Sequence, residues 1–500
     1  MRKISTLLLV AMTAIAARAT DYNVPISVTV NGVTSEQMGV ISIVENDGLY
    51  DLTMKNFMLQ TVTGPMGVGN VELKGIEPCQ DGDATLLLTS DQVQITDGDD
   101  PNVPVWMASM LPPVNVLLRG KMESDHLRCY LDIDMMESLG QLIQVAIGEG
   151  YQMPNSGFEF WHDSDATHEE PNGWHSFESA TGDLAAFAGH HLTKNKNAHT
   201  GESCARIYAT SIFGIVANGT MTTGRLNAGS AIASDVANNA YLDASLPDVD
   251  GNGNPFYIPM YSRPDSVAVW VKFRQGSPNE EHPYATISAV ITDGTYYQDP
   301  EDKAYTNVVG KAKNNEIATT GGEWVRVTAP FVYTENDVDP KAVLVTVSTN
   351  ADPGAGSDGD EVLIDDIRFI YNAKATGLKV KGQDVPGFSP DVTTYEMELD
   401  EDVTADDIEV IVEGNTANVA KRMTLVDGSN AISVVVLSAD LSTMAQYVIK
   451  GSTTAIRGIQ TAANRSAAYF TLDGRQAKTL MPGRIYICRQ ADGTVTKVRL

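Results

Sequence analysis

VLIDDIRFIY at residues 362–371 and PNSGFEFW at residues 154–161 bracket the middle of the chain. Both segments have the β-branched and aromatic residues of strands. The segment at residues 154–161 carries one carboxylate, Glu159. The segment at residues 362–371 carries two, Asp365 and Asp366. Many β-sandwich binding modules begin and end in this way, so we expect residues 150–372 to form one unit.

Strand patterns continue between these two segments. Residues 266–273 place Val267, Val269, Val271 and Phe273 on one face, which predicts a half-buried strand. Residues 324–327 and 343–348 are two more strand candidates. This order predicts a jelly-roll, galactose-binding-like sandwich.

The flanking regions also have the patterns of β structure. Short strands separated by Gly, Asp and Asn turns predict a small antiparallel barrel over residues 20–149, filled by its own side chains. Alternating segments over residues 373–452 predict an immunoglobulin-like sandwich. Residues 453–500 combine a Ser/Thr/Ala linker with a short β segment. The predicted fold class is therefore all-β.

The overall charge limits the ligands that the protein can bind. The formal net charge of -29 disfavours nucleic acid and anionic membranes, which would be repelled. Neutral ligands and cations remain open, and the acidity also suits the solubility of an exported protein.

Residues 1–19 have the pattern of a signal peptide. Arg2 and Lys3 precede an apolar run at residues 4–16, and Ala17 and Ala19 predict cleavage before Thr20. The run is short for a membrane span, and no cysteine follows it to carry a lipid. We expect an exported protein of the periplasm, cell surface or extracellular space, with no transmembrane segment.

Four cysteines lie far apart, at Cys79, Cys129, Cys204 and Cys488, without a C-x-x-C pattern. Export permits disulfides, and Cys79–Cys129 is the one pair within a single predicted unit. Two free buried thiols are the alternative.

A structural Ca²⁺ site is predicted at one end of the jelly roll. Glu159, Glu202 and Asp366 would supply carboxylates from the first strand, the following turn and the last strand, with carbonyls near Gly201. Alternatively, Asp365 and Asp366 end a strand in solvent. Residues 248–254 match half of an EF-hand loop, but Pro259 stands at its twelfth position, which favours an Asx-rich turn.

Sugar recognition needs planar apolar faces with polar groups at their edges. The candidate carbohydrate-binding aromatics in loops or at strand ends are Trp161, Trp174, Tyr257 and Tyr261, with Tyr296 and Tyr297 as further candidates. Trp270 and Trp324 lie within strand patterns and are assigned to the core. The alternative is that all of these aromatics are core residues.

Catalytic patterns are sparse. His190, His191 and His199 could bind zinc, but no H-E-x-x-H motif accompanies them, which favours scattered loop histidines. There is no G-x-S-x-G context, and the sequence does not single out the pair of carboxylates that a glycosidase needs. No catalytic residue is assigned.

Several motifs of residues 150–372 together resemble the PCMD family, named for a carbohydrate metabolism domain. They are TMTTGRL at 220–226, NPF at 254–256, SRPDSV at 262–267, PFVY at 330–333, STN at 348–350 and LIDDI at 363–367. The resemblance implies a connection with glycans.

Other parts of the chain resemble other families. Residues 47–52 and 67–71 resemble calycin-like β-barrels of exported bacterial proteins. GFSPDVTTY at 387–395 resembles the cadherin-like sandwich repeats of bacterial surface proteins, and the C-terminal β segment resembles sorting segments of Bacteroidetes.

The sequence thus predicts an exported, multidomain glycan-binding protein of the cell envelope, with the jelly roll as its carbohydrate-binding module. One alternative is a glycoside hydrolase or related carbohydrate-active enzyme on the same sandwich. The other is a structural surface protein without a small-molecule ligand.

Overall fold

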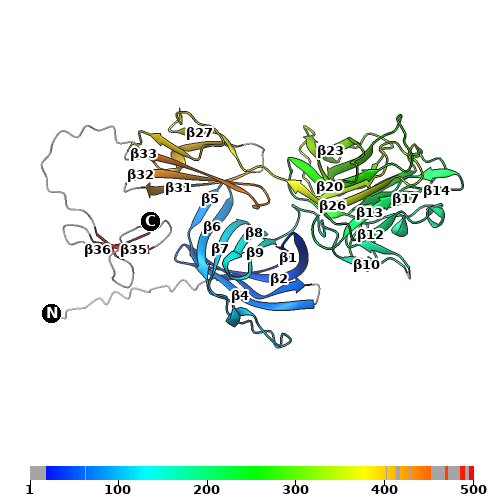
Figure 1. The fold of residues 1–500 in the computed structure, drawn as a ribbon. Helices are drawn as coiled ribbons and strands as arrows, with labels where there is room; N and C mark the ends of the chain where they lie inside the picture. The colour runs from blue at the N-terminus through cyan, green and yellow to red at the C-terminus, as the bar shows by residue number, and fades with distance from the viewer. Residues whose placement is uncertain are drawn as a thin grey trace, which may run out of the picture.

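The structure is a computed structural model. It describes residues 18–61, 64–124, 126–165, 167–400, 402–412, 417–426, 429–451, 468–470, 485–489 and 495–499. Strands dominate, and α1 (Met136–Leu139) is a single turn. Figure 1 shows a blue to cyan barrel, a green to yellow sandwich and an orange sandwich. The predicted all-β class is confirmed.

The N-terminal unit is one antiparallel sheet in the order β4-β3-β2-β1-β9-β8-β7-β6-β5, curled into a nearly closed barrel. One face of each long strand turns inward, and its apolar side chains, such as Ile41, Leu52 and Leu131, pack together. The strands are β1 (Arg18–Val30), β2 (Val33–Asn46), β3 (Leu49–Thr61), β4 (Gly64–Ile76), β5 (Pro78–Asp81), β6 (Ala84–Val93), β7 (Val114–Glu123), β8 (His126–Met135) and β9 (Gln141–Ile147).

The central unit is a sandwich whose two layers share β24 (Val325–Tyr333). Residues 325–330 of β24 pair with β20, and residues 331–333 pair with β23, so the strand passes from one layer to the other. The first layer contains β12 (Leu192–Asn195), β13 (Cys204–Tyr208), β26 (Glu361–Ile370) and β20 (Ser266–Arg274). The second contains β23 (Val308–Ile317), β21 (Ala285–Thr292), β25 (Ala342–Ser348), β16 (Thr220–Thr222) and β19 (Ile258–Pro259).

Alternation along the strands builds the core between these layers. Val267, Val269, Val271 and Phe273 of β20 are buried, as the sequence predicted. Ile287 and Ala289 of β21, with Val343, Val345 and Val347 of β25, meet them from the second layer. Successive strand residues point to opposite faces, so the residues between them lie on the outer face.

Smaller elements surround the sandwich. A three-stranded sheet, β17 (Arg225–Ala228), β18 (Asn238–Leu242) and β22 (Tyr297–Asp299), packs Leu226 and Leu242 onto Leu344 of β25. Two hairpins are β10 (Trp161–Asp163) with β11 (Glu169–Pro171), and β14 (Thr210–Ile212) with β15 (Ile215–Ala217). Two 3-10 turns, η2 (Phe177–Ser179) and η3 (Ala185–Phe187), lie between β11 and β12.

The following unit is a two-sheet sandwich with the orders β28-β27-β30 and β29-β33-β32-β31. Its core includes Ile432, Val434 and Tyr447. The strands are β27 (Ala375–Val380), β28 (Gln383–Asp384), β29 (Thr394–Met397), β30 (Ile408–Val412), β31 (Asn418–Val426), β32 (Ser429–Leu437) and β33 (Met444–Gly451). The short C-terminal strands β34 (Ala468–Phe470), β35 (Ile485–Arg489) and β36 (Val495–Arg499) form an antiparallel sheet.

Cys79 and Cys129 are not bonded to each other, and Cys204 is also free. Both thiols are free, as in the alternative, but only Cys129 is buried and Cys79 is partly exposed. None of the helices in the described part of the chain has the length and apolar character needed to cross a membrane.

Trp174 does not lie on an exposed sugar-binding face, and this part of the prediction is wrong. The side chain is 0% exposed in the sandwich core. Its ring packs edge-on against the Phe158 ring, with the ring centroids 5.3 Å apart. Its indole N–H donates to the Pro154 carbonyl. The loop after β11 folds inward because a ring of this size stabilises the core when it is removed from water.

We therefore expect Trp174→Ala to lower the free energy of unfolding of the central unit by about 3–5 kcal/mol, because it leaves a large cavity. Urea denaturation followed by circular dichroism measures the loss. The control is Phe160→Ala, which truncates a ring that is 37% exposed and should cost much less. Equal losses in the two variants would contradict the burial of Trp174.

Candidate functional site

The outer face of the second layer carries rows of hydroxyl side chains. Ser348 of β25 lies between Thr220 of β16 and Thr286 of β21. In the next row, Thr346 lies beside Ser288, which is opposite Lys313 of β23. The sheet β17-β18-β22 covers the apolar end of this face, at Val290 and Leu344. The hydroxyl rows line a cleft beside it.

This cleft has a volume of about 600 Å³. Apolar side chains from segments between the strands form much of its walls. Phe177 comes from η2 and Phe187 from η3, while Phe213 lies at the turn of the β14–β15 hairpin. Phe213 is 89% exposed and Phe187 is 59% exposed. Exposed rings at the mouth of a cleft are surfaces that a ligand can cover.

Polar and charged side chains also line the cleft. They include Asn218 and Asn239, whose amide oxygens are buried beneath the cleft surface and have no hydrogen-bond partner among the described residues. Asp299 is the only carboxylate in the described lining, and it accepts a 2.9 Å hydrogen bond from the Ser288 hydroxyl. Lys313 is the only cationic side chain in that lining. The cleft is therefore close to neutral although the chain is strongly acidic.

The predicted carbohydrate-binding aromatics do not line this cleft. Trp161 is half-buried on β10, packs against the sandwich core and donates its indole N–H to the Phe158 carbonyl at 2.6 Å. Tyr257 packs against the small cluster under β17-β18-β22. Tyr261 is 49% exposed and its backbone N–H donates to Gly150. The cleft rings Phe177, Phe187 and Phe213 were missed, although Gly189 and Gly214 near them signalled loops.

The predicted calcium ligands lie outside the cleft lining. Glu159 accepts hydrogen bonds from the backbone N–H groups of Glu202 at 2.9 Å and Ser203 at 3.2 Å. Asp366 accepts one from the Thr200 hydroxyl at 2.7 Å and contacts His199 Nδ1 at 2.6 Å. Glu159, Glu202 and Asp366 do not form a group with ligand atoms within 4.8 Å of one another. A structural Ca²⁺ here stays a prediction.

Asp365 is buried, so the idea that both aspartates end a strand in solvent is wrong. Its carboxyl is 0% exposed and accepts backbone N–H bonds from His199, Thr200 and Asp366. Burial, with the charge of Asp366 beside it, outweighs these bonds and raises the pKa of Asp365 to about 7. Asp366 has a φ of 46°, where β26 pairs irregularly with β20.

Trp270 and Trp324 are half-buried rather than core residues, which corrects their assignment. Val269 and Val271 point inward, so Trp270 between them points outward. The His199 ring stacks on Trp270 with centroids 3.9 Å apart and planes at 15°. Lys272 Nζ lies 5.1 Å from the Trp324 ring centroid. These contacts already cover part of both rings.

No family model matches the chain, and no curated protein matches it. The solved structures that are similar to it include three with low TM-scores. A "putative glycoside hydrolase" from Bacteroides thetaiotaomicron has a TM-score of 0.34 and 13% identity, over 60% of this chain and 96% of its own. A "putative outer membrane protein" from Bacteroides fragilis has a TM-score of 0.20 and 10% identity. This match covers 66% of this chain and 96% of the other.

The third structure is the M60 catalytic domain of Clostridium perfringens ZmpB with two CBM51 domains. It has a TM-score of 0.15 and 12% identity, over 96% of this chain and 44% of its own. At these TM-scores the three likenesses carry no argument about the function of this chain.

We expect the raised pKa of Asp365 to make stability fall with pH. Between the ordinary aspartate pKa of 3.8 and about 7, the folded protein holds a proton that the unfolded chain has released. The free energy of unfolding then decreases by at most about 1.4 kcal/mol per pH unit in this window. Asp365→Asn mimics the protonated carboxyl and should lack this contribution.

The measurement is urea denaturation of both proteins from pH 4 to 8 in the presence of a chelator. The variant should gain stability relative to the wild type as the pH rises towards 7. A difference between the two proteins that is constant over this pH range would contradict the raised pKa.

Proposed function

We propose that the central sandwich binds a neutral glycan in the cleft above β16, β25 and β21. The observation that carries the proposal is the combination of exposed rings with neutral hydroxyl and amide groups in one 600 Å³ space. Pyranose rings have apolar faces and hydroxyl-bearing edges, so they match both kinds of surface. The volume lies within the usual range for ligand pockets.

The charge of the lining favours a neutral ligand over an ionic one. Asp299 and Lys313 are its only charged members among the described residues, and they have opposite signs. Hydroxyl side chains such as Thr220 and Thr346 line the cleft, and they can exchange hydrogen bonds with sugar hydroxyls without bringing a charge into it. The resemblance of this unit to the PCMD family is in accord with a glycan.

Binding fits the cleft better than hydrolysis does. A glycoside hydrolase normally uses two carboxylates, one on each side of the scissile bond. Asp299 has no second carboxylate beside it in the described lining, and its Oδ2 is already engaged by Ser288. We therefore place the chain among exported glycan-binding proteins of the cell envelope, with hydrolysis as the second candidate.

The test is a glycan array probed with the chain from residue 20 onward, followed by affinity and turnover measurements on each hit. We expect binding without turnover. Phe213→Ala should weaken binding by about 1–3 kcal/mol and leave the melting temperature unchanged, because an exposed ring leaves no cavity.

The matched control is Phe160→Ala, an exposed ring that does not line the cleft. It should leave the affinity unchanged. Turnover of a hit would favour the hydrolase. Equal affinity of the two variants would contradict binding in this cleft. The absence of any hit on the array would contradict glycan binding and favour a structural protein.

A further inference from the structure

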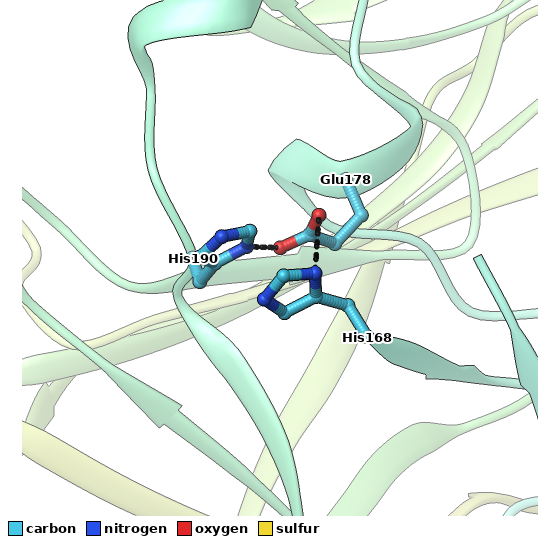
Figure 2. A group of neighbouring side chains, drawn as sticks. All are labelled: His168, Glu178 and His190. Atoms are coloured by element: carbon cyan, nitrogen blue, oxygen red, sulfur yellow. Dashed lines mark hydrogen bonds and ion pairs between the residues drawn. The ribbon is translucent and has the colours of Figure 1, made fainter. Parts of the chain in front are cut away.

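Two histidines and a glutamate converge outside the cleft lining. His168 precedes β11, Glu178 lies in η2, and His190 comes two residues before β12. One ligand atom from each lies within 4.8 Å of the other two. Figure 2 shows the Glu178 carboxylate facing a nitrogen atom of each imidazole ring. This is the only group of this kind among the described residues.

The cluster sets a nearly buried carboxylate against two histidine rings. The Glu178 side chain is only 9% exposed, and its carboxylate contacts His190 Nδ1 and lies 4.0 Å from His168 Nδ1. The two rings stack with centroids 3.3 Å apart and planes at 17°. The two imidazole rings and the carboxylate therefore lie close enough for one ion to contact all three side chains.

A second carboxylate increases the negative charge at the cluster. Both oxygens of Asp165 lie 2.9 Å from His168 Nδ1. The Asp165 side chain is 51% exposed, whereas Glu178 is only 9% exposed, and a buried carboxylate is costly unless it is paired or binds a metal. A divalent cation between the three side chains would compensate the Glu178 charge and take one nitrogen from each imidazole as a ligand.

We propose that His168, Glu178 and His190 bind one divalent transition-metal ion, with Zn²⁺ as the best match. Two imidazole nitrogens and one carboxylate oxygen are a donor set that zinc accepts. Ca²⁺ prefers oxygen ligands and is disfavoured here. Three protein ligands leave a coordination position open, and His190, whose side chain is 48% exposed, provides access from solvent.

This ligand set differs from the histidines that the sequence singled out. Only His190 belongs to it. His191 is buried between the carbonyls of Tyr208 and Ala188, and His199 stacks on Trp270. His168 and Glu178 join His190 through the fold, because η2 and the segment after η3 come together beside the β10–β11 hairpin.

The ion would connect segments that also form the cleft. Phe177, next to Glu178, lines the cleft, and so does Ala188, two residues before His190. A bound ion would therefore hold two wall segments that have little regular secondary structure. Binding only the folded chain, it would also raise stability by mass action.

The test is calorimetric titration of ZnCl₂ into the chelator-treated chain from residue 20 onward, without glycan. We expect one tightly bound ion. Glu178→Gln and His190→Gln should each weaken binding by about tenfold or more. His282→Gln is the matched control, because the His282 side chain is 38% exposed and pairs with one carboxylate, Asp352, outside the cluster. It should leave the affinity unchanged.

Zinc-edge X-ray absorption should show two imidazole nitrogens in the ligand shell. The proposal is overturned if zinc binds more weakly than about 100 μM. It is also overturned if all three variants bind zinc equally, or if Ca²⁺ competes at equal concentration. His190 is half exposed, so a thermal melt of His190→Gln checks that a loss reflects the site and not the fold. Because no glycan is present, these outcomes are separate from those of the glycan array.

Discussion

Burial of one face of β21 and β25 against the opposite layer determines which side chains face outward and line the cleft. Ile287, Ala289, Val343, Val345 and Val347 enter the core, so the residues between them must face outward. Some outward residues, Val290 and Leu344, are apolar and are covered by β17-β18-β22. The others are serines and threonines, which tolerate water. The cleft occupies the part of this face that the small sheet leaves open.

The walls of the cleft depend on a different interaction, backbone hydrogen bonding between loops and short strands. The Thr181 and Leu184 N–H groups donate to the carbonyls of Leu226 and Ala228 in β17, and the Ala228 N–H returns a bond to Thr181. The segment with η2 and η3 is thereby attached to the edge of the small sheet. Phe177 and Phe187 are positioned by these bonds, and the proposed metal ion would add a second attachment to the same segment.

The sequence predicted the parts of the fold that depend on short-range alternation. The inward face of Val267, Val269, Val271 and Phe273 is confirmed. Trp270 was wrongly assigned to the core, although the same alternation points it outward. Trp174 was misjudged because a Pro-Asn-Gly turn indicates a loop but not the direction in which the loop folds. The cleft brings together residues from 177 to 354, so no local pattern could reveal it. His168, Glu178 and His190 likewise have no motif spacing.

The strong acidity of the chain has different consequences for the two proposed sites. A net charge of -29 creates a negative potential that attracts cations and gives no advantage to a neutral sugar. The attraction weakens as salt screens exposed charges, over about 8–10 Å at physiological ionic strength. The rate at which a metal ion reaches the histidine–glutamate cluster should therefore depend on salt. Glycan binding in the near-neutral cleft depends on ring contacts and hydrogen bonds, so its affinity should change little with salt. The two sites should therefore differ in their salt dependence although they share wall segments.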